Sequence, residues 1–358
     1  MSIDLGNLFK QALKDERKVL RPYFFPADQL TSIAFTAEET YLRLRLARMF
    51  LKHRREYFQT KYPVVNSYTR LAGLENRLTY NIVVQPQISG NNEQKQLVDV
   101  VSLDQTLLGP ILYRGGDLEI ILGLYAAPAD DWAKRFIKLA EGISMLTLNA
   151  TVTTAVAMAG TVTNVLADTL GGDGLDLKLG LNIELHQNKW LTPGYLVMIA
   201  APDEQIDQTA LRVENGELLT ASNQIYNAHD YIVIEVESMA QRSDWQSLGY
   251  GRLWQTLLNR AAEADNIQIV KDAYTTFSSA ILASEDLSWP DRRAIIELTQ
   301  QRVKAIRDAR AGADFLDGIK GFESLLAVEA LVAEETVLAS SPDTHVTPSE
   351  MLATDWIE

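Results

Sequence analysis

Alternating apolar and polar residues predict β-strands over much of the first two thirds of the chain. Over residues 42–46 leucines alternate with arginines, and over 175–186 Leu or Ile at every odd position alternates with polar residues or glycine. Successive side chains of a strand point to opposite faces of its sheet, so a period of two is typical of a strand with one buried face. Both segments are therefore predicted to be strands.

Glycine-containing turns separate several further apolar runs. The runs 111–113 and 118–122 flank Gly115-Gly116, and this pattern predicts a β-hairpin. Asn215-Gly216 predicts a second hairpin turn, because both residue types accept the positive φ angles of a type I′ turn. Residues 231–234 are apolar at every position, which favours a central strand buried on both faces.

Apolar residues at helical spacing predict helices over residues 4–19, 132–143, 253–261 and 295–306. For the last of these, Ser288 and Asp291 have the spacing of a capping box, which favours a helix start at this point. Gly312 is the predicted end of this helix, since glycine is common just beyond a helix C-terminus.

This order of elements predicts an α+β fold, mainly an antiparallel sheet or β-sandwich with flanking helices and a C-terminal helical segment. Hairpins dominate the pattern and regular strand–helix–strand alternation is missing, which argues against a parallel sheet. We divide the chain into an N-terminal helix (1–28), a mixed sheet and helix core (29–265) with an inserted helix (129–170), C-terminal helices (266–338) and an acidic tail (339–358).

Composition narrows the possible functions. The 358 residues include no Cys, so thiolate zinc sites, disulfides and cysteine nucleophiles are excluded. The net charge of −14 argues against general nucleic-acid binding. The N-terminus lacks the basic and then apolar pattern of a secretion signal, so we expect a cytoplasmic protein.

No motif for catalysis or cofactor binding is recognisable. A P-loop, a dinucleotide-binding glycine motif, a zinc-peptidase motif and a kinase signature are all missing from the sequence. Among the four histidines, His229 precedes Asp230 and is the one candidate for acid–base chemistry. We expect no cofactor, no metal and no enzymatic activity, while an enzyme with an unrecognised carboxylate site stays an alternative.

A basic zone interrupts this acidic chain. Residues 41–62 carry a net charge of +6, whereas the whole chain carries −14. Such an asymmetry could serve an external acidic partner or neutralise the protein's own acidic surface or tail, and the sequence leaves both readings open. The candidate partner-binding residues are Arg43, Arg45, Arg48, Lys52, Arg54 and Arg55.

Residues 142–167 form the longest uncharged stretch that we consider, with 26 positions rich in Ala, Thr and Val. Part of the stretch alternates polar and apolar residues, as a membrane-inserting hairpin requires. A buried helix of small residues has the same composition. A membrane-active effector, released by proteolysis or loss of a partner, therefore stays an alternative function.

Three short blocks carry a resemblance to a group of bacterial proteins. They are Tyr-Arg-Gly-Gly-Asp-Leu at 113–118, Leu-Thr-Pro-Gly-Tyr at 191–195, and Asp-Tyr-Ile at 230–232 leading to Arg-Ser-Asp-Trp at 242–245. They resemble uncharacterised proteins encoded near caspase-like proteases or signalling ATPases in defence-type operons. The resemblance implies such a protein partner and an antiviral defence context, with no catalytic residue to carry over. The predicted function is thus a non-enzymatic interaction, regulatory or effector protein.

Overall fold

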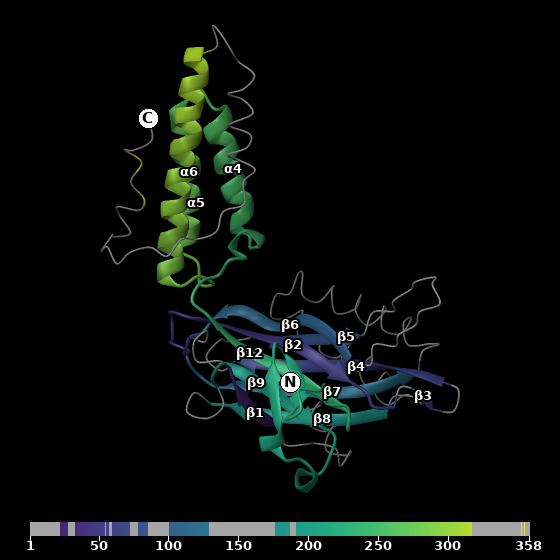
Figure 1. Ribbon diagram of the computed structural model, residues 1–358. Coiled ribbons are helices and arrows are strands. Elements are labelled where there is room, and N and C mark those ends of the chain that lie inside the picture. Colours follow the sequence, from purple (N-terminus) through teal and green to yellow (C-terminus); the bar gives the residue numbers. More distant parts are fainter. Residues whose placement is uncertain are drawn as a thin grey trace, which may run out of the picture. The chain divides into compact units, whose positions relative to one another are not determined.

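The computed structural model describes most of the chain in two compact units (Figure 1). The described residues are 22–27, 33–53, 55–56, 59–71, 78–84, 100–128, 176–186, 191–316, 352 and 354. Unit 1 comprises Met1–Phe35, Leu42–Pro110 and Arg114–Ser238, and unit 2 comprises Thr36–Tyr41, Ile111–Tyr113 and Met239–Glu358. We describe each unit separately.

The first sheet of unit 1 has five strands in the order β1-β9-β12-β2-β6. Their bounds are β1 Tyr23–Pro26, β9 Gly194–Ile199, β12 Tyr231–Met239, β2 Tyr41–Phe50 and β6 Val100–Leu112. The pairs β1–β9 and β9–β12 are antiparallel. The all-apolar run at the start of β12 is fully buried and lies between two neighbours, so the predicted central strand is confirmed.

The second sheet of unit 1 contains β3, β4, β7 and β8 in that order, and β5 pairs with β4. Their bounds are β3 Arg55–Glu56, β4 Gln59–Leu71, β5 Leu78–Val84, β7 Leu118–Pro128 and β8 Asp176–Leu185. Every one of these pairs is antiparallel. In β8, Leu181 and Leu185 are buried while Asn182 and Glu184 are exposed, as the alternating pattern predicts.

The hairpin predicted around Gly115-Gly116 is wrong in its pairing. Both flanking strands form, but β6 belongs to the first sheet and β7 to the second. Both glycines adopt positive φ angles, +84° and +92°, so the chain does turn at this point. Two apolar runs on either side of a glycine turn do not by themselves specify that the two strands pair with each other, which explains why the sequence suggested a hairpin.

The hairpin predicted at Asn215-Gly216 is confirmed. It joins β10 (Leu211–Glu214) to β11 (Glu217–Thr220), and the turn residues have φ angles of 50° and 76°. A Cβ atom on Gly216 would lie 2.9 Å from Cβ of Ala47 in β2. Close packing as well as turn geometry therefore favours glycine at this position. Three short 3₁₀ helices complete the strand-rich region and its exit: η1 (Asp203–Gln205), η2 (Gln208–Ala210) and η3 (Trp245–Ser247).

Unit 2 contains the helices α4 (Tyr250–Glu263), α5 (Ile267–Leu282) and α6 (Trp289–Leu316), shown in Figure 1. The predicted stripe of α4 is buried together with apolar residues of α5 and α6. The sequence analysis did not identify α5, and α6 continues past Gly312 for four more residues. A glycine in a helix interior costs only about 1 kcal/mol, which the surrounding turns can offset.

Arginines of α6 donate hydrogen bonds to carbonyl groups at or near the C-terminal ends of the other two helices. Arg292 donates to the carbonyl oxygens of Leu282 and Leu287 at 2.9 Å, beyond the end of α5. Arg307 donates to the Ala264 carbonyl at 3.0 Å, at the end of α4. The last carbonyls of a helix have no partner within it, so these arginines satisfy groups that otherwise need water.

The predicted α+β class with antiparallel sheets and a C-terminal helical segment is confirmed. The structure groups α4 with α5 and α6, although the predicted boundary at residue 265 places α4 with the core. The helices predicted at 4–19 and 129–170 lie outside the described residues, as does nearly all of the acidic tail.

Candidate functional site

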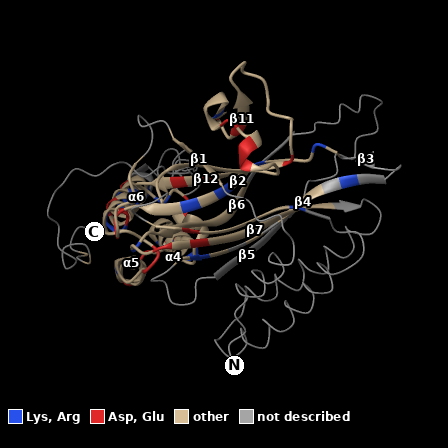
Figure 2. Ribbon diagram, turned by 90° about the horizontal axis from the view of Figure 1, so that it is seen from below, with Lys and Arg blue, Asp and Glu red and all other residues tan. Residues whose placement is uncertain are grey.

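The basic zone of β2 is paired with carboxylates of the neighbouring strand β12. Figure 2 marks Lys and Arg positions in blue and Asp and Glu positions in red along the ribbon. Arg43 donates from Nε and Nη2 to both carboxylate oxygens of Glu237, at 2.7 and 2.9 Å. Arg45 donates from Nη2 to Glu235 at 2.5 Å. Burial and the adjacent Glu235 carboxylate raise the pKa of Tyr195, which faces the same pairs from β9.

The other candidate residues continue this pattern or fall outside the described side chains. Arg48 forms an ion pair with Glu217 of β11. Lys52 uses its backbone N–H to bind the Asp230 carboxylate at 2.6 Å. Arg54 lies outside the described residues, and the Arg55 side chain is likewise not described, although its backbone forms part of β3.

These contacts agree with the interpretation that the basic zone neutralises acidic groups of the protein itself. Three of its arginines each have a carboxylate partner from unit 1 itself. An external acidic ligand would have to compete with those partners, so the arginines already have reduced capacity for it. Partner binding by the six candidate residues stays a prediction.

A double-mutant cycle tests the contribution of the Arg43–Glu237 pair. The two side chains are 26% and 27% exposed, so solvent screens the pair and we expect a coupling free energy of about 1 kcal/mol. The cycle combines Arg43→Gln and Glu237→Gln and measures urea unfolding of all four proteins. Strictly additive effects would show that the two side chains are not coupled. Arg43 would then be available to bind an external acidic partner.

His229 and Asp230, the one candidate for acid–base chemistry, bind different partners. The His229 Nδ1 atom lies 2.6 Å from the Tyr226 hydroxyl oxygen, while the Asp230 carboxylate accepts the Lys52 N–H. Neighbouring residues in a sequence need not share a hydrogen bond. Here the Asp230 carboxylate accepts a backbone N–H just beyond the end of β2 instead. Among the described residues, the partner of the His229 ring is thus a tyrosine hydroxyl and not a carboxylate that would orient it for proton transfer.

His186, on the polar side of the alternating segment 175–186, has a partner. Its Nδ1 atom lies 2.8 Å from a carboxylate oxygen of Asp117, and both side chains are about half exposed. No group of three or more His, Asp or Glu residues in the described part of the chain could hold a metal ion. The uncharged stretch 142–167 lies outside the described residues, and none of the described helices is long and apolar enough to cross a membrane.

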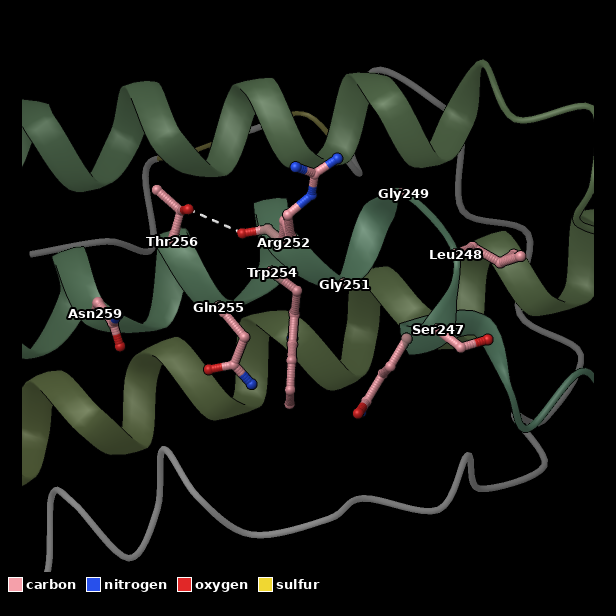
Figure 3. Close-up of a pocket in the computed structure, with 10 residues that line it drawn as sticks. Ser247, Leu248, Gly249, Gly251, Arg252, Trp254, Gln255, Thr256 and Asn259 are labelled. Atoms are coloured by element: carbon pink, nitrogen blue, oxygen red, sulfur yellow. Dashed lines mark hydrogen bonds between the residues drawn. The ribbon is translucent and has the colours of Figure 1, made fainter. Parts of the chain in front are cut away.

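A hollow of about 680 Å³ lies along the outer surface of α4 (Figure 3). Figure 3 shows Arg252 and Thr256 along one side of the helix and Gln255 and Asn259 along the other. Each pair has i, i+4 spacing, which places its members in one row on a helix surface. The described lining residues are Gln246, Ser247, Leu248, Gly249, Gly251, Arg252, Trp254, Gln255, Thr256 and Asn259.

Trp254 lines this hollow with a small part of its surface, and its side chain carries an unpaired buried donor. Only 2% of the residue is exposed, and its ring meets that of Trp245 edge-on, with centroids 5.5 Å apart. Its indole N–H is buried and finds no acceptor among the described residues. An unpaired buried donor costs about 1–3 kcal/mol.

Gly251 allows η3 to pass close to the first turn of α4. A Cβ atom at this position would lie 1.8 Å from the carbonyl oxygen of Gln246. The first residues of the hollow, Gln246 to Gly249, are therefore held against α4 by a backbone contact that only glycine permits.

Sequence reasoning missed this site because its residues look like an ordinary solvated helix face. The stripe that ends with Ala261 correctly identified the buried side of α4, which leaves Gln255 and Asn259 on the other side. One signal was available: between Gly249 and Asn259 the only charged residue is Arg252, in a chain where 22% of residues are charged. An outer helix face usually carries more charge than this.

Comparison with known proteins identifies no relative of this chain. The chain matches no protein-family model, no curated protein and no solved structure.

Proposed function

We propose that this chain is a non-enzymatic interaction protein that binds a polypeptide segment of a protein partner in the hollow along α4. The observation that carries the proposal is the nearly uncharged lining of the hollow, in which the amide side chains of Gln255 and Asn259 lie beside apolar groups. An amide side chain both donates and accepts hydrogen bonds, as a peptide main chain does, so Gln255 and Asn259 suit peptide recognition.

The same lining disfavours other ligand classes. Sugars and nucleic-acid bases bind largely by stacking on an exposed aromatic face, and the Trp254 ring is almost entirely buried. Arg252 is the only cation among the described lining residues, too little to hold a nucleic-acid backbone. A polypeptide needs neither stacking nor several cations, so it is the ligand class that fits best.

The partner's identity rests on the sequence resemblance. A caspase-like protease or a signalling ATPase of a bacterial defence system is the partner that this resemblance implies, and a cytoplasmic location fits both. The proposed role for the chain is then regulatory: it holds a segment of that partner.

Retention of the partner tests the proposal. The full chain is immobilised and exposed to extract of its native host, and retained proteins are identified by mass spectrometry. We expect Gln255→Glu to weaken retention of the partner about tenfold, because the carboxylate keeps the side chain's size but removes its donor. Gln301→Glu is the matched control, since Gln301 is an exposed glutamine on α6 outside the hollow.

Two results decide the matter. A protein lost from the Gln255→Glu variant and kept by the Gln301→Glu variant supports binding in the hollow. Equal retention by wild type and both variants would overturn the proposal, whatever proteins are captured.

A further inference from the structure

The turn of the β10–β11 hairpin contains the only Asn–Gly dipeptide of the sequence, Asn215-Gly216. Asparagine is a thermolabile residue, and Asn215 is exposed to solvent. A following glycine increases the lability, because without a side chain its backbone nitrogen can approach the side-chain carbonyl carbon of the asparagine. Asn223 provides a comparison within the chain: it is also exposed and has a φ angle of 61°, but Gln224 follows it.

The reaction of such a pair consumes only water. The Gly216 nitrogen loses its proton to solvent and attacks the side-chain carbonyl carbon of Asn215, and the amide nitrogen leaves as ammonia. Water then opens the cyclic succinimide at either carbonyl group, which gives aspartate or isoaspartate. In isoaspartate the backbone runs through the former side-chain carbon, so the turn gains an additional backbone atom.

In the folded protein, contacts with the first sheet hold the Gly216 nitrogen away from this reaction. Gly216 is buried, and its N–H donates a hydrogen bond to the Tyr195 hydroxyl oxygen on β9. A Cβ atom on Gly216 would lie 2.9 Å from Cβ of Ala47, so this peptide lies close against β2. The N–H that the reaction must remove is therefore engaged. The peptide also has no room to rotate toward the Asn215 side chain while the turn stays on the sheet.

The residue after the turn holds the hairpin on the same sheet. Glu217 forms an ion pair with Arg48 of β2 and lies opposite Glu214 in the hairpin register. Both contacts depend on the length of the turn. Isoaspartate at position 215 would lengthen the chain between Glu214 and Glu217, so a modified turn cannot restore both contacts together.

We propose that Asn215 is a site of spontaneous deamidation that is closed while the β10–β11 hairpin packs on β2 and β9 and opens when the hairpin lifts. The inference is independent of the proposed function, because the site lies outside the α4 hollow and the reaction requires no partner. A surface hairpin opens locally at a lower free-energy cost than global unfolding. The reaction is irreversible, so chains with a displaced hairpin accumulate with time.

Peptide mapping by mass spectrometry measures the reaction, because it separates peptides with asparagine, aspartate or isoaspartate at position 215. The full chain is incubated at neutral pH with and without urea. We expect product at Asn215 and none at Asn223 in urea, and a rate at Asn215 at least about tenfold lower in the folded protein. A lack of product at Asn215 in urea, or equal rates in the folded and unfolded chains, would overturn the inference.

Tyr195→Phe tests the contact that closes the site. The substitution removes the acceptor of the Gly216 N–H, so we expect the folded variant to deamidate about fivefold faster than wild type, as for the loss of one hydrogen bond. Tyr23→Phe is the matched control, because the Tyr23 hydroxyl donates to Asp203 at 3.0 Å instead. An unchanged rate in Tyr195→Phe, or the same acceleration in Tyr23→Phe, would contradict the proposed role of the turn contacts.

Circular dichroism shows whether each variant is folded before its rate is compared. Arg48→Gln makes the same comparison if Tyr195→Phe does not fold, because it removes the ion pair that holds Glu217 on β2. We expect this variant to deamidate faster than wild type as well. A folded Arg48→Gln protein with the wild-type rate would show that the packing of the hairpin does not control the reaction.

Discussion

Replacing Gly251 by alanine is expected to lower the free energy of unfolding of the helical unit by about 3 kcal/mol. The new Cβ would lie 1.8 Å from the carbonyl oxygen of Gln246 and 2.8 Å from its carbonyl carbon. Both are backbone atoms, so no side chain can rotate away and η3 must move relative to α4. Urea unfolding, followed by helical circular dichroism, measures the effect.

Gly249→Ala is the matched control for this substitution. Gly249 also lines the hollow, but a Cβ at this position would meet nothing within 4 Å. Its φ angle of −53° suits any L-residue, so we expect a change within about 0.5 kcal/mol. Equal effects of the two substitutions would show that η3 is not held against α4 by the contact at Gly251.

The close approach at Gly251 also links the fold to the candidate site. The moved segment would include Gln246 and Ser247, which line one end of the hollow. We therefore expect Gly251→Ala to impair partner retention even at temperatures where the helices stay folded. Gly249→Ala should leave retention unchanged.

Local patterns in the sequence predicted local structure well. Three predictions are confirmed: the alternation in β8, the Asn215-Gly216 turn and the buried stripe of α4. Each depends only on residues that are close together in the sequence. The failures concern what a segment meets at a distance. The residues around Gly115-Gly116 form the predicted strands, but only the tertiary structure assigns β6 and β7 to different sheets.

The candidate site shows the same limit. The Arg43 and Glu237 side chains are separated by 194 residues in the sequence, so their pairing has no local signature. Gly251 is an unremarkable glycine until η3 is placed beside it. Trp254 lies on the predicted apolar stripe and is buried, but whether its indole N–H has an acceptor depends on how distant residues such as Trp245 pack against it.

A buried polar network inside unit 2 joins the start of β2 to the start of α6. The Tyr41 hydroxyl donates to Oδ2 of Asp291 at 2.6 Å and accepts the N–H of Ser288 at 2.7 Å. The backbone N–H of Arg242 donates to the same carboxylate oxygen at 2.8 Å. The predicted capping box is confirmed in one half, since Asp291 N–H donates to Ser288 Oγ at 3.3 Å. In the other half, the Tyr41 hydroxyl stands between the Ser288 N–H and the Asp291 carboxylate.

Asp291→Ala is expected to lower the free energy of unfolding by about 3 kcal/mol at neutral pH. It leaves the Tyr41 hydroxyl and the Arg242 N–H without an acceptor, and each unpaired buried donor costs about 1–3 kcal/mol. Removal of a buried charge recovers part of this cost. Asp291→Asn, which keeps an acceptor oxygen of similar position, should cost clearly less. Urea unfolding at pH 7 compares the two, and equal losses would show that the carboxylate oxygen is not the acceptor that matters.

The pH dependence of this network follows from the environment of Asp291. Burial raises the pKa of this carboxyl group, although the Tyr41 and Arg242 hydrogen bonds and the Arg242 charge oppose the rise. A raised pKa in the folded state means that the folded protein binds this proton more tightly than the unfolded chain. The corresponding stabilisation is complete below the ordinary carboxyl pKa near 4 and is lost as the pH rises through the raised value.

The stability of wild type relative to Asp291→Asn should therefore fall as the pH increases from about 4, because only the wild type loses a proton from this buried site. Unfolding both proteins in urea across this range measures the difference and cancels the titration of all other groups. A difference that rises with pH would mean that the hydrogen bonds from Tyr41 and Arg242 outweigh burial. The folded protein would then favour the charged form of this carboxyl group more than the unfolded chain does.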